Sequence, residues 1–124
     1  MVDDVLRTTL LEQRLPPRLT AAVQVRRITL RPGVSGGAHR HNGPVFGSIE
    51  RGSVVLQVEG GPERLLQAGD VFYEPADAVI TRWDATAEGV EFLGYFLLEE
   101  GQVPELEPVR PTGDEATEHD ERLP

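Results

Sequence analysis

The stretch that decides the fold spans residues 33–52 and reads GVSGGAHRHNGPVFGSIERG. Its centre is the triplet His39, Arg40 and His41. Because successive side chains of a β-strand point to opposite faces, His39 and His41 point the same way and Arg40 points the other way. Two imidazoles on one face can bind one metal ion, so the histidine pair is the first candidate site.

The chain on both sides of this stretch is predicted to form short β-strands. Runs of Val, Ile, Leu and Phe are separated by Gly and Pro about every ten residues, which is typical of all-β sandwiches and barrels. The pair Gly60 and Gly61 follows an alternating strand and signals a tight hairpin. The expected strands are residues 22–30, 38–41, 45–50, 53–59, 63–66, 71–74, 78–83 and 90–98.

A second stretch, residues 69–84, reads GDVFYEPADAVITRWD, and together the two stretches resemble the paired motifs of the cupin superfamily. The first family motif reads Gly, five residues, His-x-His, three or four residues, Glu, six residues, Gly. Every spacing fits here, and Val45 stands in place of the Glu. The second motif reads Gly, five residues, Pro-x-Gly, two residues, His, three residues, Asn, and here Ile80 stands in place of the His. The resemblance implies an all-β fold, a single cupin-type β-barrel or jelly roll of antiparallel strands.

In cupins the two histidines of the first motif, its Glu and the His of the second motif usually bind one divalent metal. The resemblance therefore implies a site for Fe, Mn, Ni or Zn at His39 and His41. Two imidazoles alone bind weakly, so a further ligand is needed. Glu74 is the candidate, because strand alternation places it on the same face as Phe72, directly before the motif proline. Two histidines and one carboxylate form the set that holds non-haem Fe(II).

The sequence leaves open which face of the strand before the motif proline lies inside. If Glu74 points outward, it is a solvated carboxylate and the two histidines are remnants of a lost site. We expect an apolar pocket lined by Val45, Phe72, Ile80 and Trp83. The alternative is that these side chains fill a small core, with Trp83 packed in it or beneath a partner subunit.

Two functions follow from these alternatives. The first is a metal-dependent enzyme that acts on a small organic molecule by dioxygenation, isomerisation, or lyase or cyclase chemistry. The second is a non-catalytic module that senses or carries an apolar small molecule after losing its metal. The fold alone does not choose between them.

Composition excludes several other classes of protein. The net charge of −9 and the absence of a basic cluster argue against nucleic acid and anionic membranes as partners. The chain has no Cys, and all its basic residues are Arg, which excludes thiol nucleophiles and Schiff-base lysines. No apolar run suggests secretion, so a cytoplasmic location is expected. A homodimer is also expected, because a barrel of about 80 residues has a small core.

The sequence also predicts that the chain is divided into three segments. Residues 1–19 are expected to form an arm or a short helix, and residues 20–100 the barrel. Residues 101–124 are rich in Pro and acidic side chains, which predicts a disordered tail.

Overall fold

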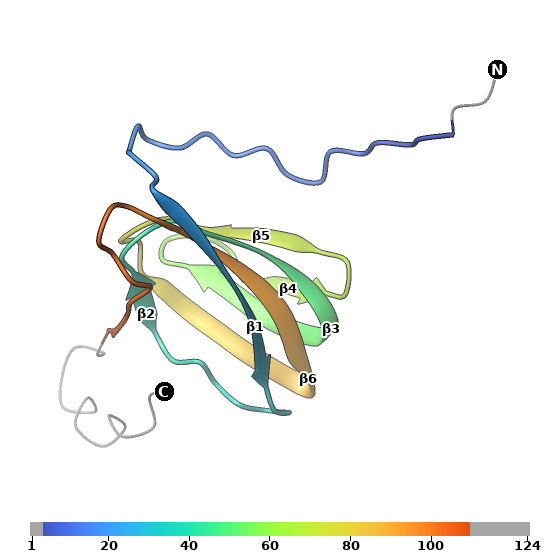
Figure 1. The fold of residues 1–124 in the computed structure, drawn as a ribbon. Helices are drawn as coiled ribbons and strands as arrows, with labels where there is room; N and C mark the ends of the chain where they lie inside the picture. The colour runs from blue at the N-terminus through green and yellow to red at the C-terminus, as the bar shows by residue number, and fades with distance from the viewer. Residues whose placement is uncertain (1–3, 110–124) are drawn as a thin grey trace.

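Two long antiparallel strands, β3 (Val45–Val58) and β6 (Ile80–Leu98), run side by side through the centre of the computed structural model (Figure 1). The structure describes residues 4–109. Buried positions alternate with partly exposed ones along most of both strands, which is the pattern expected of strands with one face toward a core. The two ends of this pair carry different neighbouring strands, so the pair connects the two halves of the barrel.

Five short strands extend the sheet from the edges of this pair. They are β1 (Ala22–Leu30), β2 (His39–His41), β4 (Arg64–Gln67), β5 (Val71–Glu74) and β7 (Leu106–Pro108). β1 and β2 pair with β6, β4 and β5 pair with β3, and β7 pairs with β2. Every one of these pairings is antiparallel, which confirms the all-β class predicted from the sequence.

Each long strand unites two segments that the sequence predicted as separate strands. The predicted breaks fall near Gly52 in β3 and Gly89 in β6, but the ladder continues past both, with register shifts on either side of Gly52. The two glycines have φ angles of 75° and 72°, a left-handed conformation that glycine adopts easily. A Cβ atom on Gly52 would collide with the carbonyl oxygen of Gly89. The facing glycines therefore let both strands bend together without breaking the ladder.

An apolar core fills the space enclosed by the strands. Trp83 lies near its centre, with ring-centre distances of 4.9 Å to both Phe72 and Phe92. The indole is 5% exposed. The buried residues of this cluster are Ile49, Val54, Leu56, Leu66, Phe72, Ile80, Trp83, Ala85, Val90 and Phe92.

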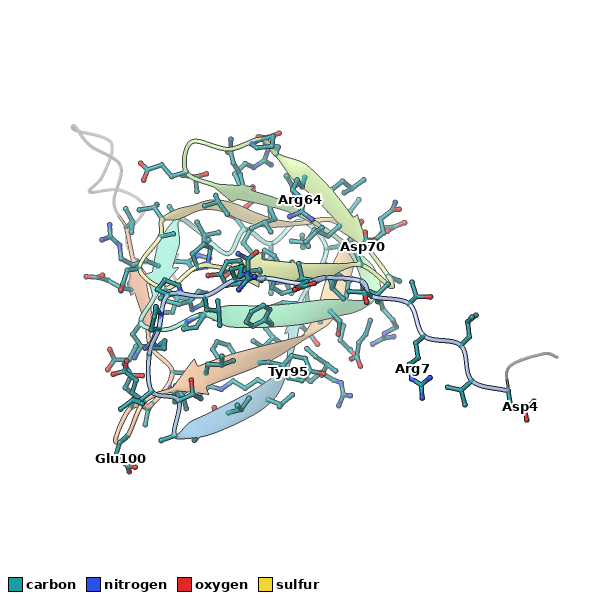
Figure 2. The ribbon with its side chains drawn as sticks, turned by 90° about the horizontal axis from the view of Figure 1, so that it is seen from above. Asp4, Arg7, Arg64, Asp70, Tyr95 and Glu100 are labelled. Atoms are coloured by element: carbon teal, nitrogen blue, oxygen red, sulfur yellow. The ribbon has the colours of Figure 1, made fainter. Side chains whose placement is uncertain are left out.

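The N-terminal segment forms an extended arm rather than a helix. Residues 4–21 contain neither helix nor strand, and Figure 2 shows Asp4 and Arg7 beyond the edge of the sheet. The arm contacts the barrel near the start of β1, where Arg18 forms an ion pair of 3.2 Å with Glu99. The described residues include no helix that could span a membrane.

The ordered barrel extends beyond the predicted boundary at residue 100. Residues 101–109 turn back, and β7 pairs with the histidine strand β2. This part of the predicted tail thus contains a short strand that pairs with β2. Residues 110–124 lie outside the described residues.

Gly52→Ala should destabilise the fold strongly, because Ala would meet both the unfavourable φ and the collision with Gly89. We expect a loss of about 3 kcal/mol or more in the free energy of unfolding, measured by urea denaturation. Gly60→Ala is the matched control, since Gly60 has a φ of 81° but open space around it, and it should lose only about 1 kcal/mol. Equal losses in the two variants would contradict the role given to the bend.

Candidate metal centre

The two histidines of the triplet point into the barrel. His39 and His41 are 3% and 9% exposed, whereas the intervening Arg40 lies on the outer side with its guanidinium 3.8 Å from Glu107. β2 is short, but β6 holds it on one edge, where His39 pairs with Ile80, and β7 holds it on the other. The structure therefore confirms that His39 and His41 point to one face of the strand and Arg40 to the other.

Glu74 also points into the barrel, which answers the question that the sequence left open. It is the last residue of β5, is 3% exposed, and pairs across the ladder with Val45 of β3. Directly opposite residues in an antiparallel pair place their side chains on the same face with Cβ atoms about 5 Å apart. Glu74 thus places a carboxylate beside the position of Val45, where cupins usually carry one.

The hydrogen bonds of His39 fix which ring nitrogen faces Glu74. Its Nδ1 lies 2.8 Å from the carbonyl oxygen of Gly37. Because a carbonyl oxygen only accepts, Nδ1 carries the proton and donates. In the neutral ring the lone pair is therefore on Nε2, which lies 3.8 Å from Oε1 of Glu74. His41 presents its Nε2 to the same oxygen at 2.7 Å.

Opposing effects set the pKa values of this cluster. Burial has the largest effect on His39 and lowers its pKa, but the carboxylate of Glu74 and the carbonyl of Gly37 together outweigh burial and raise the pKa above 6.5. Burial likewise raises the pKa of Glu74, but the interactions with His39 and His41 outweigh it and lower the pKa below 4.5. His39 and Glu74 thus attract each other as an ion pair when the imidazole is protonated and no metal is bound.

These two shifts set the pH range in which the ion pair stabilises the metal-free fold. The contribution of His39, whose pKa is raised, is complete below pH 6.5 and is lost as the pH rises through the folded-state pKa. The contribution of Glu74, whose pKa is lowered, is complete above pH 4.5 and is lost as the pH falls through its folded-state pKa. The stabilisation from both groups is therefore greatest between these two values.

The donor atoms fit a divalent cation. One ligand atom from each of His39, His41 and Glu74 lies within 4.8 Å of the other two, and all three residues are buried. Two imidazoles and a carboxylate match the set that binds non-haem Fe(II) and also suit Mn(II) or Zn(II), with further coordination positions left for substrate. The carbonyl of Gly37 supplies the second hydrogen bond that metal-binding histidines commonly make.

A cavity of about 310 Å³ opens beside the three residues. Its walls are mainly apolar, and its rim includes the exposed Arg26, Glu105 and Leu106. The described lining residues are Arg26, Ile28, Thr29, Leu30, Gly36, His39, His41, Val45, Phe72, Glu74, Trp83, Phe92, Phe96, Pro104, Glu105 and Leu106. This combination of apolar walls and a few polar groups is typical of small-molecule sites.

Three of the four residues predicted to line the pocket are on this wall. Val45, Phe72 and Trp83 border the cavity, but Ile80 does not. Ile80 is 0% exposed and belongs to the apolar core, because its place opposite His39 is covered by neighbouring side chains. Arg26 was not among the predicted lining residues, because alternation along its strand identifies it only once Ile28 is known to face the core.

The C-terminal segment closes one side of the cavity, and composition gave no sign of this. Asn42, directly after the histidine strand, holds the segment through its side chain. Its Nδ2 donates to the carbonyl oxygen of Val103 at 3.0 Å, and its Oδ1 accepts from the backbone N–H of Glu105 at 3.2 Å. The turn that ends β2 therefore also fixes the segment that supplies Pro104 and Leu106 to the cavity wall.

The comparison with protein families agrees with this architecture. Residues 26–90, just over half of the chain, match the Cupin_2 family, which is described as a cupin domain. The chain belongs to the cupin family. The resemblance inferred from the two motifs is thus confirmed. No curated protein sequence gives a significant match to this cupin.

Solved structures show the same fold at low sequence identity. A cupin-like protein from Thermotoga maritima is 26% identical, with a TM-score of 0.59 and coverage of 77% of this chain and 74% of that protein. The DMSP lyase DddQ from Ruegeria pomeroyi is 18% identical, with a TM-score of 0.63 and coverage of 74% and 45%. Salicylate 1,2-dioxygenase from Pseudaminobacter salicylatoxidans is 16% identical, with a TM-score of 0.54 and coverage of 60% and 20%. The chain spans 44% and 45% of the two DMSP lyase structures it matches.

Glu74→Gln should lower the pKa of His39 in protein stripped of metal, because it removes the carboxylate whose interactions raise that pKa. Titration of the imidazole followed by NMR measures the change. Glu63→Gln is the matched control, since Glu63 is an exposed carboxylate that pairs with Arg82 away from the cluster. If the pKa of His39 is the same in both variants, the ion pair described here is contradicted.

Proposed function

We propose that this cupin is a metal-dependent enzyme that acts on a small organic molecule, with His39, His41 and Glu74 as the metal ligands. One observation carries the proposal: three buried donor groups converge within 4.8 Å at the wall of a largely apolar cavity. Burying a carboxylate away from water is costly unless it is paired. The arrangement is readily explained if the carboxylate balances the charge of a cation.

Each of the three residues has a distinct part in such a site. The neutral imidazoles present lone pairs from Nε2, and the carbonyl of Gly37 holds the ring of His39 in the orientation that binding requires. Glu74 adds one negative charge and leaves a divalent site with net positive charge. A bound divalent metal would polarise a substrate oxygen or activate water or dioxygen. The apolar wall around Phe96 and Trp83 would exclude bulk water from the substrate.

The identity of the metal and the reaction class belong to this proposal. The ligand set favours Fe(II), and Mn(II), Ni(II) and Zn(II) are the alternatives. Oxalate decarboxylase from Bacillus subtilis, which contains Mn(II) centres, is 24% identical with a TM-score of 0.53 and coverage of 64% of this chain and 22% of that chain. The similar structures thus include a lyase, a dioxygenase and a decarboxylase. The fold they share with this chain does not choose among dioxygenation, isomerisation, and lyase or cyclase chemistry.

The second candidate is a non-catalytic module that binds an apolar small molecule. Val45 and Ile80, at positions where cupins usually carry ligands, favour it. The position of Glu74 opposite Val45 argues for the enzyme, because it places a carboxylate beside the position where cupins usually carry one. In a module without metal, the buried carboxylate and the two imidazoles would serve only to stabilise the fold.

Metal content separates the two candidates. Untagged protein purified without chelators should contain close to one divalent metal per chain by inductively coupled plasma mass spectrometry. His39→Ala with His41→Ala should abolish the metal. Glu74→Gln should weaken binding by more than about tenfold, since even the loss of groups that orient metal ligands commonly costs about 10–100-fold.

Glu63→Gln controls for the change in charge, and circular dichroism checks that each variant is folded. Full metal content in the folded double histidine variant would overturn the ligand assignment. Substoichiometric metal in the wild type, even after addition of Fe(II), Mn(II), Ni(II) and Zn(II), would favour the binding module.

A further inference from the structure

Arg26 stands at the rim of the cavity on the inner side of β1. It alternates with Ile28 and Leu30, which also line the cavity. Its guanidinium carbon lies 5.4 Å from the ring centre of Phe96. The ring of Phe96 lies 5.9 Å from that of His41. One aromatic ring therefore separates the guanidinium from the histidine cluster.

Arg26 has no carboxylate partner within ion-pair distance among the described residues; Arg31 and Arg64 of the barrel also lack one, but neither lines this cavity. Five others form ion pairs within 4.0 Å; they are Arg18, Arg27, Arg40, Arg51 and Arg82. The Nε of Arg26 donates to Oε1 of Gln24, a neutral group on the same strand. The positive charge of Arg26 is thus not neutralised by a carboxylate.

Arg26 is also the only Lys or Arg among the described residues that line the cavity. Guanidinium groups bind carboxylates in a planar, two-pronged arrangement that lysine does not reproduce. The walls between Arg26 and His41 are apolar and aromatic. A ligand that fills this space therefore has an apolar body, a reactive part beside the histidines and an anionic group at the rim.

We propose that Arg26 anchors the carboxylate of the substrate, and that the substrate class is small organic acids with an apolar body. This proposal rests on the proposed function for the reaction that the acid would undergo. The binding of the acid by Arg26 can be measured separately from that reaction. Two carboxylates, Glu74 and Glu105, also line the cavity, so a cationic ligand is the competing class. Glu74 is already paired with two imidazoles, whereas the guanidinium of Arg26 has no carboxylate partner and lies beside the aromatic wall, 5.4 Å from the ring centre of Phe96.

The chain contains its own fluorescent reporter for a binding test. Trp83 is its single tryptophan and lines the cavity, so a ligand in the cavity should change the tryptophan emission. The probes are benzoate, benzamide and benzylamine, which share a ring and differ in charge. Zn(II)-loaded wild type should bind benzoate about tenfold more tightly than benzamide, the size expected for one charge-assisted contact. Benzylamine should bind more weakly than benzoate.

Arg26→Gln should remove the preference for benzoate and leave the affinity for benzamide unchanged, which also shows that the cavity is intact. Arg27→Gln is the matched control: it makes the same change in charge one residue along β1, on the opposite face, where Arg27 pairs with Glu50. This control should keep the preference. Equal affinities of wild type for benzoate and benzamide, tighter binding of benzylamine, or no response to benzoate would overturn the proposal.

The same titrations on metal-free protein separate this proposal from the proposed function. A preference for benzoate that depends on Arg26 in a protein that binds no metal would support the anchor and contradict the metalloenzyme. If the protein binds one metal per chain and the preference for benzoate survives Arg26→Gln, the metalloenzyme is supported and the anchor is contradicted, since the metal would then hold the carboxylate.

Discussion

The pairing of Val45 with Glu74 across β3 and β5 is the constraint on which the site depends. Strand pairing allows only two orientations for Glu74, and this register turns it toward the histidines. A buried carboxylate is stable only with partners of opposite charge or with strong hydrogen-bond donors. His39 and His41 fill that role in the metal-free protein, and the raised pKa of His39 reflects it. The site is thus a product of the register between two strands as much as of the histidine motif.

The rest of the fold maintains that register. The long β3–β6 pair bends at Gly52 and Gly89, which lets each half of it join a different set of short strands. The aromatic contacts of Trp83 fill the core beside the cavity. β7 adds backbone hydrogen bonds to the short histidine strand, which would otherwise have an unpaired edge. Removing any of these elements would loosen the convergence of the three donor groups.

Local patterns in the sequence predicted the strand class and the inward direction of the histidine pair, because residues two apart on a strand share a face. They could not orient Glu74, since alternation defines two faces without saying which one is inside. They did not predict β7, because a segment rich in Pro and acidic residues becomes ordered here only through pairing with β2. The expected place of Ile80 on the cavity wall was wrong, since its burial depends on side chains distant in the sequence. Arg26 follows from alternation only once Ile28 is known to face the core.

The central claim is that His39, His41 and Glu74 bind one divalent metal inside the barrel. Anomalous diffraction from crystals of the protein grown with Mn(II) or Zn(II) tests it most directly, because it locates the metal and its ligands together. We expect one strong peak about 2.0–2.2 Å from an Nε2 atom of each histidine and from a carboxylate oxygen of Glu74. A barrel with no anomalous peak, or a peak held by other side chains while this trio keeps the contacts described above, would contradict it.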